Sequence, residues 1–81
     1  MRKGVTEFAR RMEARLRSNS HKGGWSSCEL LWLLGRLREE TDELAECLTS
    51  RDKDAAEAMD EAADVGNFAM MIHDNLRRNK P

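Results

Sequence analysis

Four carboxylates in two separate segments have the types and spacing expected of a cation site. Glu40 and Glu43 lie three residues apart in the segment LREETDELAE. Glu61 and Asp64 repeat this spacing in the segment DEAAD. Residues three apart on a helix project from one face, so each pair would present its oxygens together. Converging carboxylates repel one another unless a hard divalent cation neutralises them, and oxygen-only ligands suit Mg²⁺ or Mn²⁺.

The second pair has unusual surroundings. On a helix, Glu61 and Asp64 lie on the same side as Phe68, Met71 and Ile72, and this apolar side should be buried. No basic residue lies within four positions of either acid. A buried ionised carboxylate is costly unless it is paired or holds a metal ion, so these two acids require a partner from outside their own segment.

Ordinary surface ion pairs are the alternative explanation for the acids. Arg36 can reach Glu40 across one helical turn, and Arg38 can reach Asp42 in the same way. This alternative also accounts for Glu39 as a surface acid. It accounts for the first acidic segment but not for the second.

The charges are strongly segregated along a chain whose net charge is −1. Residues 1–22 contain seven basic and two acidic side chains, residues 29–64 contain four basic and twelve acidic ones, and residues 65–81 contain three basic and one acidic. A concentrated acidic middle is typical of a cation site, and basic ends can receive an anion that accompanies the cation. Three solvated helix faces that differ in sign are the simpler alternative.

The chain of 81 residues predicts a single domain, 1–81, with a marginal core for a monomer. Two cysteines and 40% apolar residues exclude a disulfide scaffold and argue against disorder. The longest apolar run, LLWLL, is too short to span a bilayer, and MRKGV does not begin a secretory signal. We therefore expect a cytoplasmic protein without a membrane partner.

Three helices account for nearly the whole chain, and no segment alternates with the period of a strand. The expected ranges are about 5–17, 26–48 and 54–78. The first has a thin apolar seam of Phe8, Met12 and Leu16. Ser26 and Glu29 predict a capping box for the second helix, and Asp54 with Glu57 predicts a cap for the third. The fold class is therefore all-α, a three-helix subunit.

Apolar residues predict that this subunit assembles into a helical-bundle homo-oligomer, a dimer or a tetramer. The expected core face of the second helix consists of Leu30, Leu34, Leu37, Leu44 and Leu48. Trp32 lies nearly opposite these leucines, and a tryptophan on a polar face usually meets a partner or a ligand. The third helix is apolar around most of its circumference, and Gly66 would allow a neighbouring helix to approach closely.

The acidic segments resemble the EExxE and ExxD signature of the MazG-like, all-α nucleoside triphosphate pyrophosphohydrolases. EETDE, seventeen residues and then EAAD match that signature, while HKGGW and EAADVGNFAMMI resemble the short phage and mobile-element members. The resemblance implies a helical dimer or tetramer that uses Mg²⁺, or Mn²⁺ as a substitute, to split a (deoxy)nucleoside triphosphate into the monophosphate and pyrophosphate. It implies Glu40, Glu43, Glu61 and Asp64 as metal ligands, with Glu39 assisting the metal or acting as the base for the attacking water.

The loop SHKGGW and the third helix offer candidates for substrate binding. His21 and Lys22 can meet phosphate oxygens, and Trp25 can stack on a base. Asn67 and Asn75 lie on or beside the acidic face of the third helix and can contact base or ribose. Each candidate has a simpler alternative. Trp25 can be part of a hydrophobic staple at the start of the second helix, and His21 can be a solvated loop residue. Asn67 and Asn75 can be ordinary helix-surface residues.

We therefore expect a Mg²⁺-dependent nucleotide pyrophosphohydrolase with a house-cleaning or pool-adjusting role. The alternative is a non-catalytic helical oligomer that acts as a small interaction or cation-binding module. Nucleic-acid binding through the basic first helix is weaker, because the acidic middle opposes a long polyanion. We expect no nucleic-acid partner.

Overall fold

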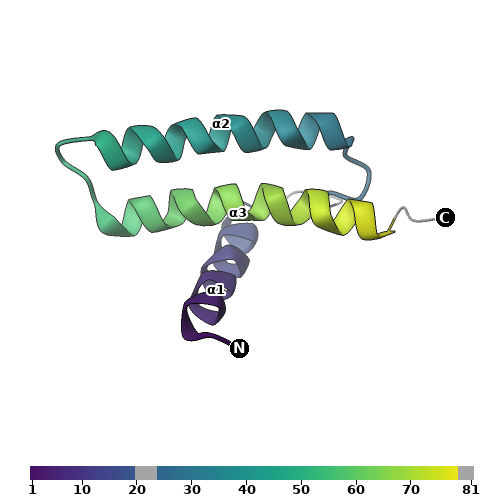
Figure 1. The fold of residues 1–81 in the computed structure, drawn as a ribbon, viewed down its shortest axis with the longest axis horizontal. Helices are drawn as coiled ribbons and strands as arrows, with labels where there is room; N and C mark the ends of the chain where they lie inside the picture. The colour runs from purple at the N-terminus through teal and green to yellow at the C-terminus, as the bar shows by residue number, and fades with distance from the viewer. Residues whose placement is uncertain (20–23, 79–81) are drawn as a thin grey trace.

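The computed structural model describes residues 1–19 and 24–78, which form three helices and, within these ranges, no strand. They are α1 (Lys3–Ser18), α2 (Leu30–Thr49) and α3 (Ala55–Arg78). α2 and α3 lie side by side as an antiparallel hairpin, and α1 runs away at a steep angle to them (Figure 1). Within the described residues, α1 packs against α3 and not against α2. The all-α prediction is confirmed.

The cap predicted at the start of α3 is present. The backbone N–H of Ala56 donates to the Asp54 carboxylate at 2.9 Å, and that of Ala58 donates to the Asp54 carbonyl at 2.9 Å. An acidic side chain at this position satisfies a free N–H group and interacts favourably with the positive end of the helix dipole. The third helix therefore begins where its sequence predicts.

The predicted start of the second helix is wrong. Residues 25–28 form a turn in which the Cys28 N–H donates to the Trp25 carbonyl at 3.0 Å, and α2 begins only at Leu30. Glu29 is extended, with φ −72° and ψ 146°, and its side chain makes no capping hydrogen bond. The turn persists because Asn75 of α3 donates to the carbonyls of Trp25 and Cys28, at 3.0 and 3.2 Å.

The predicted core face of α2 is only partly correct. Leu34, Leu37 and Leu44 are half-buried, but Leu30 and Leu48 are 37% and 49% exposed. The fully buried leucine is Leu33, which the helical pattern missed. The leucines at the two ends of this face are therefore less covered than those in its middle.

α1 docks where α3 has no side chain. A Cβ atom added at Gly66 would lie 2.6 Å from the Phe8 ring and 3.5 Å from the Met12 sulfur. The predicted seam of α1 therefore contacts α3, and the absent side chain lets α1 approach closely. We expected Gly66 to serve an approach between subunits, whereas the described contact lies within one chain.

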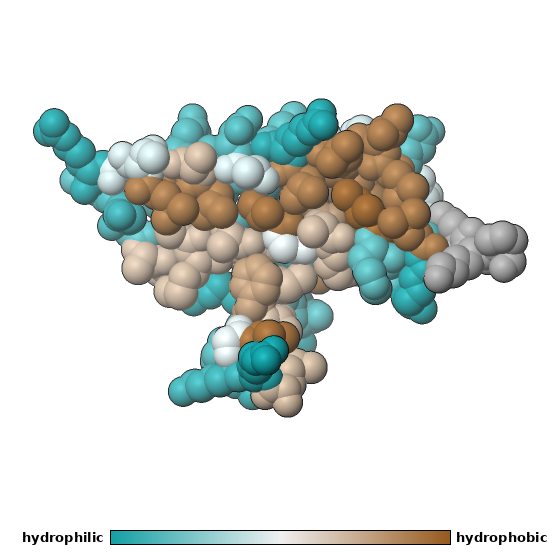
Figure 2. Space-filling model, viewed as in Figure 1, coloured by the Kyte–Doolittle hydropathy of each residue, from teal (hydrophilic) through white to brown (hydrophobic). Residues whose placement is uncertain are grey.

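Part of the apolar surface remains open on this chain. Hydrophobic side chains gather along α2 and the adjoining side of α3 (Figure 2). Leu31 and Trp32 are 79% and 56% exposed, as the polar-side position of the tryptophan predicts. Among the described residues, no helix is both long enough and apolar enough to cross a membrane. Assembly into an oligomer stays a prediction.

Candidate functional site

The antiparallel hairpin brings three of the four predicted metal ligands together. Carboxylate oxygens of Glu40, Glu43 and Glu61 all lie within 4.8 Å of one another. Glu40 is buried, Glu61 is half-buried and Glu43 is exposed, so this acidic cluster has one open side. The cluster forms because α2 and α3 each contribute residues from the face that packs on the other helix.

The surroundings of the acidic cluster disfavour its negative charge. Burial raises the pKa of Glu40 to about 7, and the hydrogen bond and charge of Glu43 add to this effect. Burial also raises the pKa of Glu61, with further contributions from the charges of Glu43 and Asp64. The Glu61 Oε2 atom is buried, and no group of the described residues donates a hydrogen bond to it. Buried oxygens of this kind normally accept a hydrogen bond or contact a cation, so this oxygen of Glu61 is the one in the cluster that calls for a partner.

Asp64, the fourth predicted ligand, faces a different partner. Arg15 of α1 donates to both of its oxygens, from Nε and from Nη2, each at 2.9 Å. This bond is the largest cause that raises the pKa of the Arg15 guanidinium above its ordinary value. The sequence predicted that Asp64 takes a partner from outside its own segment, and Arg15 is such a partner. Its role as a metal ligand stays a prediction.

Glu39, the predicted base, lies at the exposed edge of α2. Arg36 donates to Glu39 and, at 3.3 Å, to Glu40, so the predicted pairing of Arg36 with Glu40 is confirmed. The same guanidinium lies over the ring of Phe68, 5.0 Å from its centroid. Glu39 is thus close to the acidic cluster in the chain but is not one of its three members.

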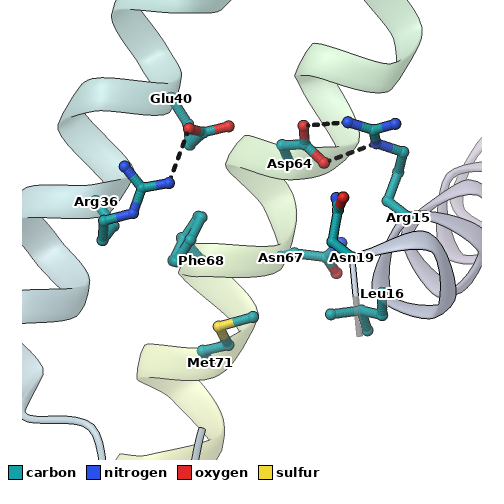
Figure 3. A pocket seen from close by; sticks show the side chains of 9 residues that line it. All are labelled: Arg15, Leu16, Asn19, Arg36, Glu40, Asp64, Asn67, Phe68 and Met71. Carbon is teal, nitrogen blue, oxygen red and sulfur yellow. Dashed lines mark hydrogen bonds and ion pairs between the residues drawn. The ribbon is translucent and has the colours of Figure 1, made fainter. Parts of the chain in front are cut away.

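A cavity of about 290 Å³ adjoins the acidic cluster and is bounded by all three helices. The side chains that line it are Arg15, Leu16, Asn19, Arg36, Glu40, Asp64, Asn67, Phe68 and Met71 (Figure 3). Glu40 belongs both to the acidic cluster and to this cavity. The arrangement therefore places carboxylates, two guanidinium groups and an aromatic ring around one space.

The predicted substrate residues fall into three groups. Asn67 lines the cavity, donates to the Met12 carbonyl at 3.0 Å and has a buried Oδ1 atom with no hydrogen-bond partner. Asn75 and Trp25 lie elsewhere, around the turn that precedes α2. His21 and Lys22 lie outside the described residues.

Trp25 and Asn75 have clear structural contacts. The indole N–H of Trp25 donates to Asp74 at 3.0 Å. Hydrogen bonds from Arg77, Trp25 and Arg78 lower the pKa of Asp74 to about 2. Asn75 is 1% exposed and supports the turn through its two bonds to backbone carbonyls. These contacts hold the start of α2 against the end of α3, and substrate binding by either residue stays a prediction.

Sequence reasoning missed Arg15 as a residue of the site. A signal for it exists in the spacing, because Arg11 and Arg15 are four apart on α1 and Asp60 and Asp64 are four apart on α3. Arg11 donates to Asp60 at 2.6 Å, in parallel with the pair formed by Arg15 and Asp64. Matching spacings of opposite charge on two amphipathic helices predict that the helices dock in register.

Comparisons of this chain with models of protein families, with curated proteins and with solved structures find no match.

Proposed function

We propose that this protein is a Mg²⁺-dependent nucleoside triphosphate pyrophosphohydrolase that converts a (deoxy)nucleoside triphosphate and water into the monophosphate and pyrophosphate. The observation that carries the proposal is the acidic cluster of Glu40, Glu43 and Glu61. These residues come from the EETDE and EAAD segments, whose resemblance to the MazG-like signature suggested a shared metal site.

The residues of the acidic cluster fit a hard divalent cation. Three carboxylates supply oxygen ligands, one side of the cluster is open, and Glu61 contributes a buried oxygen without a partner. Glu40, Glu43 and Glu61 would hold the cation, and Asp64, the fourth ligand that the resemblance implies, would join them. When bound, Mg²⁺ would neutralise charge on the phosphate oxygens and lower the pKa of a bound water molecule.

The other residues around the cavity would bind and orient the substrate. In the proposed reaction, water attacks the α-phosphorus. The bond from this phosphorus to the oxygen that bridges it to the β-phosphorus breaks, and pyrophosphate leaves. Glu39, at the exposed edge of the site, is the candidate that accepts the proton from the attacking water. Asn67 borders the cavity, and its amide group would contact base or ribose.

A non-catalytic helical module is the second candidate. The observation in its favour is the pair formed by Arg15 and Asp64, because a carboxylate already held by two hydrogen bonds has an ordinary structural role. In that case the remaining acids would bind a cation without turnover, or none.

Release of pyrophosphate separates the two candidates. The protein is incubated with each ribonucleoside and deoxyribonucleoside triphosphate in Mg²⁺, and pyrophosphate is measured. We expect turnover of at least one nucleotide. Glu61→Gln should lower the rate of pyrophosphate release by about a hundredfold or more, because even the loss of a residue that only hydrogen-bonds to a metal ligand lowers activity by up to about a hundredfold. Glu46→Gln, which removes an exposed acid of α2 outside the acidic cluster, should retain activity.

Circular dichroism of each variant checks that the helices are intact. If the folded protein releases no pyrophosphate from any nucleotide, the enzyme proposal is wrong and the helical module is favoured. Equal activities of Glu61→Gln and Glu46→Gln would also contradict the assignment of the acidic cluster as the centre of the reaction.

A further inference from the structure

Two guanidinium groups border the cavity, and neither belongs to the expected set of substrate residues. Arg15 enters from α1 and Arg36 from α2, on either side of Asp64 and Phe68 of α3 (Figure 3). Their side chains are 28% and 35% exposed, so both can be reached by a ligand. Guanidinium groups from separate helices that meet at one cavity form a natural site for a multivalent anion.

Each of these arginines is held by a carboxylate of the expected metal-ligand set. Arg15 makes two bonds to Asp64, whereas Arg36 donates to Glu40 and also to Glu39, which lies outside that set. A cation that takes these carboxylates competes directly with the arginines. Two of the acids that would ligate the cation, Asp64 and Glu40, therefore occupy guanidinium donors of Arg15 and Arg36.

We propose that Arg15 and Arg36 bind phosphate groups of the ligand that enters this cavity, and that a divalent cation frees them by taking Asp64 and Glu40. The inference rests on the proposed function for the identity of that ligand, a phosphate chain that enters together with a divalent cation. Phosphate matches the two-pronged geometry that Arg15 already uses on Asp64. Each guanidinium thus exchanges one anion for another and is never left without a partner.

The docking of α1 permits this exchange without movement of the helix. Arg11 stays bound to Asp60, while Phe8 and Met12 stay against Gly66. Only the Arg15 side chain needs to change partner. The packing of Arg36 over the Phe68 ring likewise remains possible when its Glu40 contact is lost.

The exchange predicts opposite effects of one substitution on two ligands. Arg15→Gln removes a competitor for Asp64, so Mn²⁺ alone should bind several-fold more tightly. The same substitution removes a phosphate donor, so imidodiphosphate in saturating Mg²⁺ should bind about tenfold more weakly or worse. By linkage, the wild-type protein should bind imidodiphosphate more tightly in Mg²⁺ than in its absence.

The test measures Mn²⁺ binding by electron paramagnetic resonance and imidodiphosphate binding by calorimetry, without any turnover. Arg11→Gln is the matched control for Arg15→Gln, because it removes the same charge from the same helix but releases no expected ligand. Arg38→Gln, on the exposed side of α2, is the control for Arg36→Gln. We expect the controls to change either affinity by less than about threefold, as for exposed charges.

Arg15→Lys keeps the charge without the two-pronged geometry and should show an intermediate loss of imidodiphosphate affinity. Circular dichroism confirms that each variant is folded. The proposal is overturned if Arg15→Gln weakens both ligands, changes neither, or behaves like Arg11→Gln. It is also overturned if the wild-type protein fails to bind imidodiphosphate in Mg²⁺.

Two further measurements identify the source of the phosphate and separate this inference from the proposed function. An α,β-imido deoxynucleoside triphosphate that binds more tightly than imidodiphosphate, with the same dependence on Arg15, supports a nucleotide as the ligand. Arginine-dependent binding in a protein that never releases pyrophosphate would support the exchange and refute the enzyme. Pyrophosphate release that is unaffected in Arg15→Gln and Arg36→Gln would refute the exchange alone.

Discussion

Glu40 occupies a position where a buried leucine would be expected. It is 6% exposed on the face of α2 that packs on α3, in the same row as the fully buried Leu33. Glu43 and Asp64 oppose its ionisation, and Arg36 favours it. A carboxyl group with a pKa of about 7 is only partly ionised near neutrality, and a bound cation favours its ionised form, so pH and cation binding act on the same group.

The raised pKa of Glu40 predicts that the cation-free protein loses stability as pH rises. The pKa of Glu40 is about 7 in the native state, whereas the pKa of a free glutamate side chain is 4.5. Between these two pKa values the native state binds more protons than the unfolded state. The stabilisation from the bound proton is therefore complete below pH 4.5 and is lost as the pH rises through about 7. We expect the free energy of unfolding to fall by about 2–3 kcal/mol at most between about pH 5 and pH 8.

Urea denaturation in a chelator at several pH values measures this loss. Glu40→Gln should remove most of the pH dependence, Glu46→Gln should retain it, and excess Mg²⁺ should restore stability at the alkaline end. A free energy of unfolding that rises with pH in the cation-free protein would contradict the assigned state of Glu40.

At the scale of the elements, α1 is positioned by charge and by the absence of one side chain. Its arginines meet Asp60 and Asp64, and its apolar seam meets Gly66. α1 buries no residue fully, so its hold on α3 depends on these few contacts. The position of Arg15 at the cavity follows from this docking.

A double-mutant cycle tests the close approach at Gly66. Alanine favours a helix over glycine by up to about 1 kcal/mol, but its Cβ atom would collide with the Phe8 ring. In a Phe8→Ala background, Gly66→Ala should therefore stabilise the protein. In the wild-type background it should be less favourable by about 1 kcal/mol or more, because the ring or the helix must shift.

The free energies of unfolding of the four proteins, from urea denaturation, give this coupling. Gly35→Ala is the control, since its added Cβ meets no atom within 4 Å and should be unaffected by Phe8→Ala. Equal effects of Gly66→Ala in both backgrounds would show that α1 does not dock on this position.

At the scale of the whole molecule, three helices leave much apolar surface uncovered. Only Leu33, Ala63 and Met71 form the buried apolar core of the described residues. The two ends of the leucine stripe on α2 are exposed, and Figure 2 shows hydrophobic residues along this side of the hairpin. A small domain with such a surface gains stability when a second copy covers it.

Self-association should therefore depend on the uncovered leucine stripe. Leu48→Glu should shift the protein towards monomer, raising the dissociation constant about tenfold or more if this leucine lies in the centre of the contact. Thr49→Glu adds the same charge to the neighbouring exposed position and should leave association unchanged. Sedimentation velocity over a range of concentrations measures both.

A wild-type protein that remains monomeric at high concentration would contradict the expected homo-oligomer. Equal dissociation by Leu48→Glu and Thr49→Glu would instead show that the added charge, and not the lost leucine, is responsible.

The sequence alone determined the three helices and the pairing of two acidic segments, because helical period and the Asp54 cap are local properties. It predicted the meeting of Glu40, Glu43 and Glu61, since their i, i+3 spacing puts each acidic segment on one helix face and an antiparallel hairpin joins those faces. The local sequence predicted the wrong start for α2, because two hydrogen bonds from Asn75 of α3 hold residues 25–28 in a turn where a helical cap was predicted.

Only the tertiary structure decided which partner each acid meets. Arg15 reaches Asp64 across 49 residues, a contact that no window of neighbouring residues contains. The burial of Leu33 and the exposure of Leu48 likewise depend on how the helices pack. Side-chain spacing defines a face, but the neighbour that covers this face is set by packing of the whole chain.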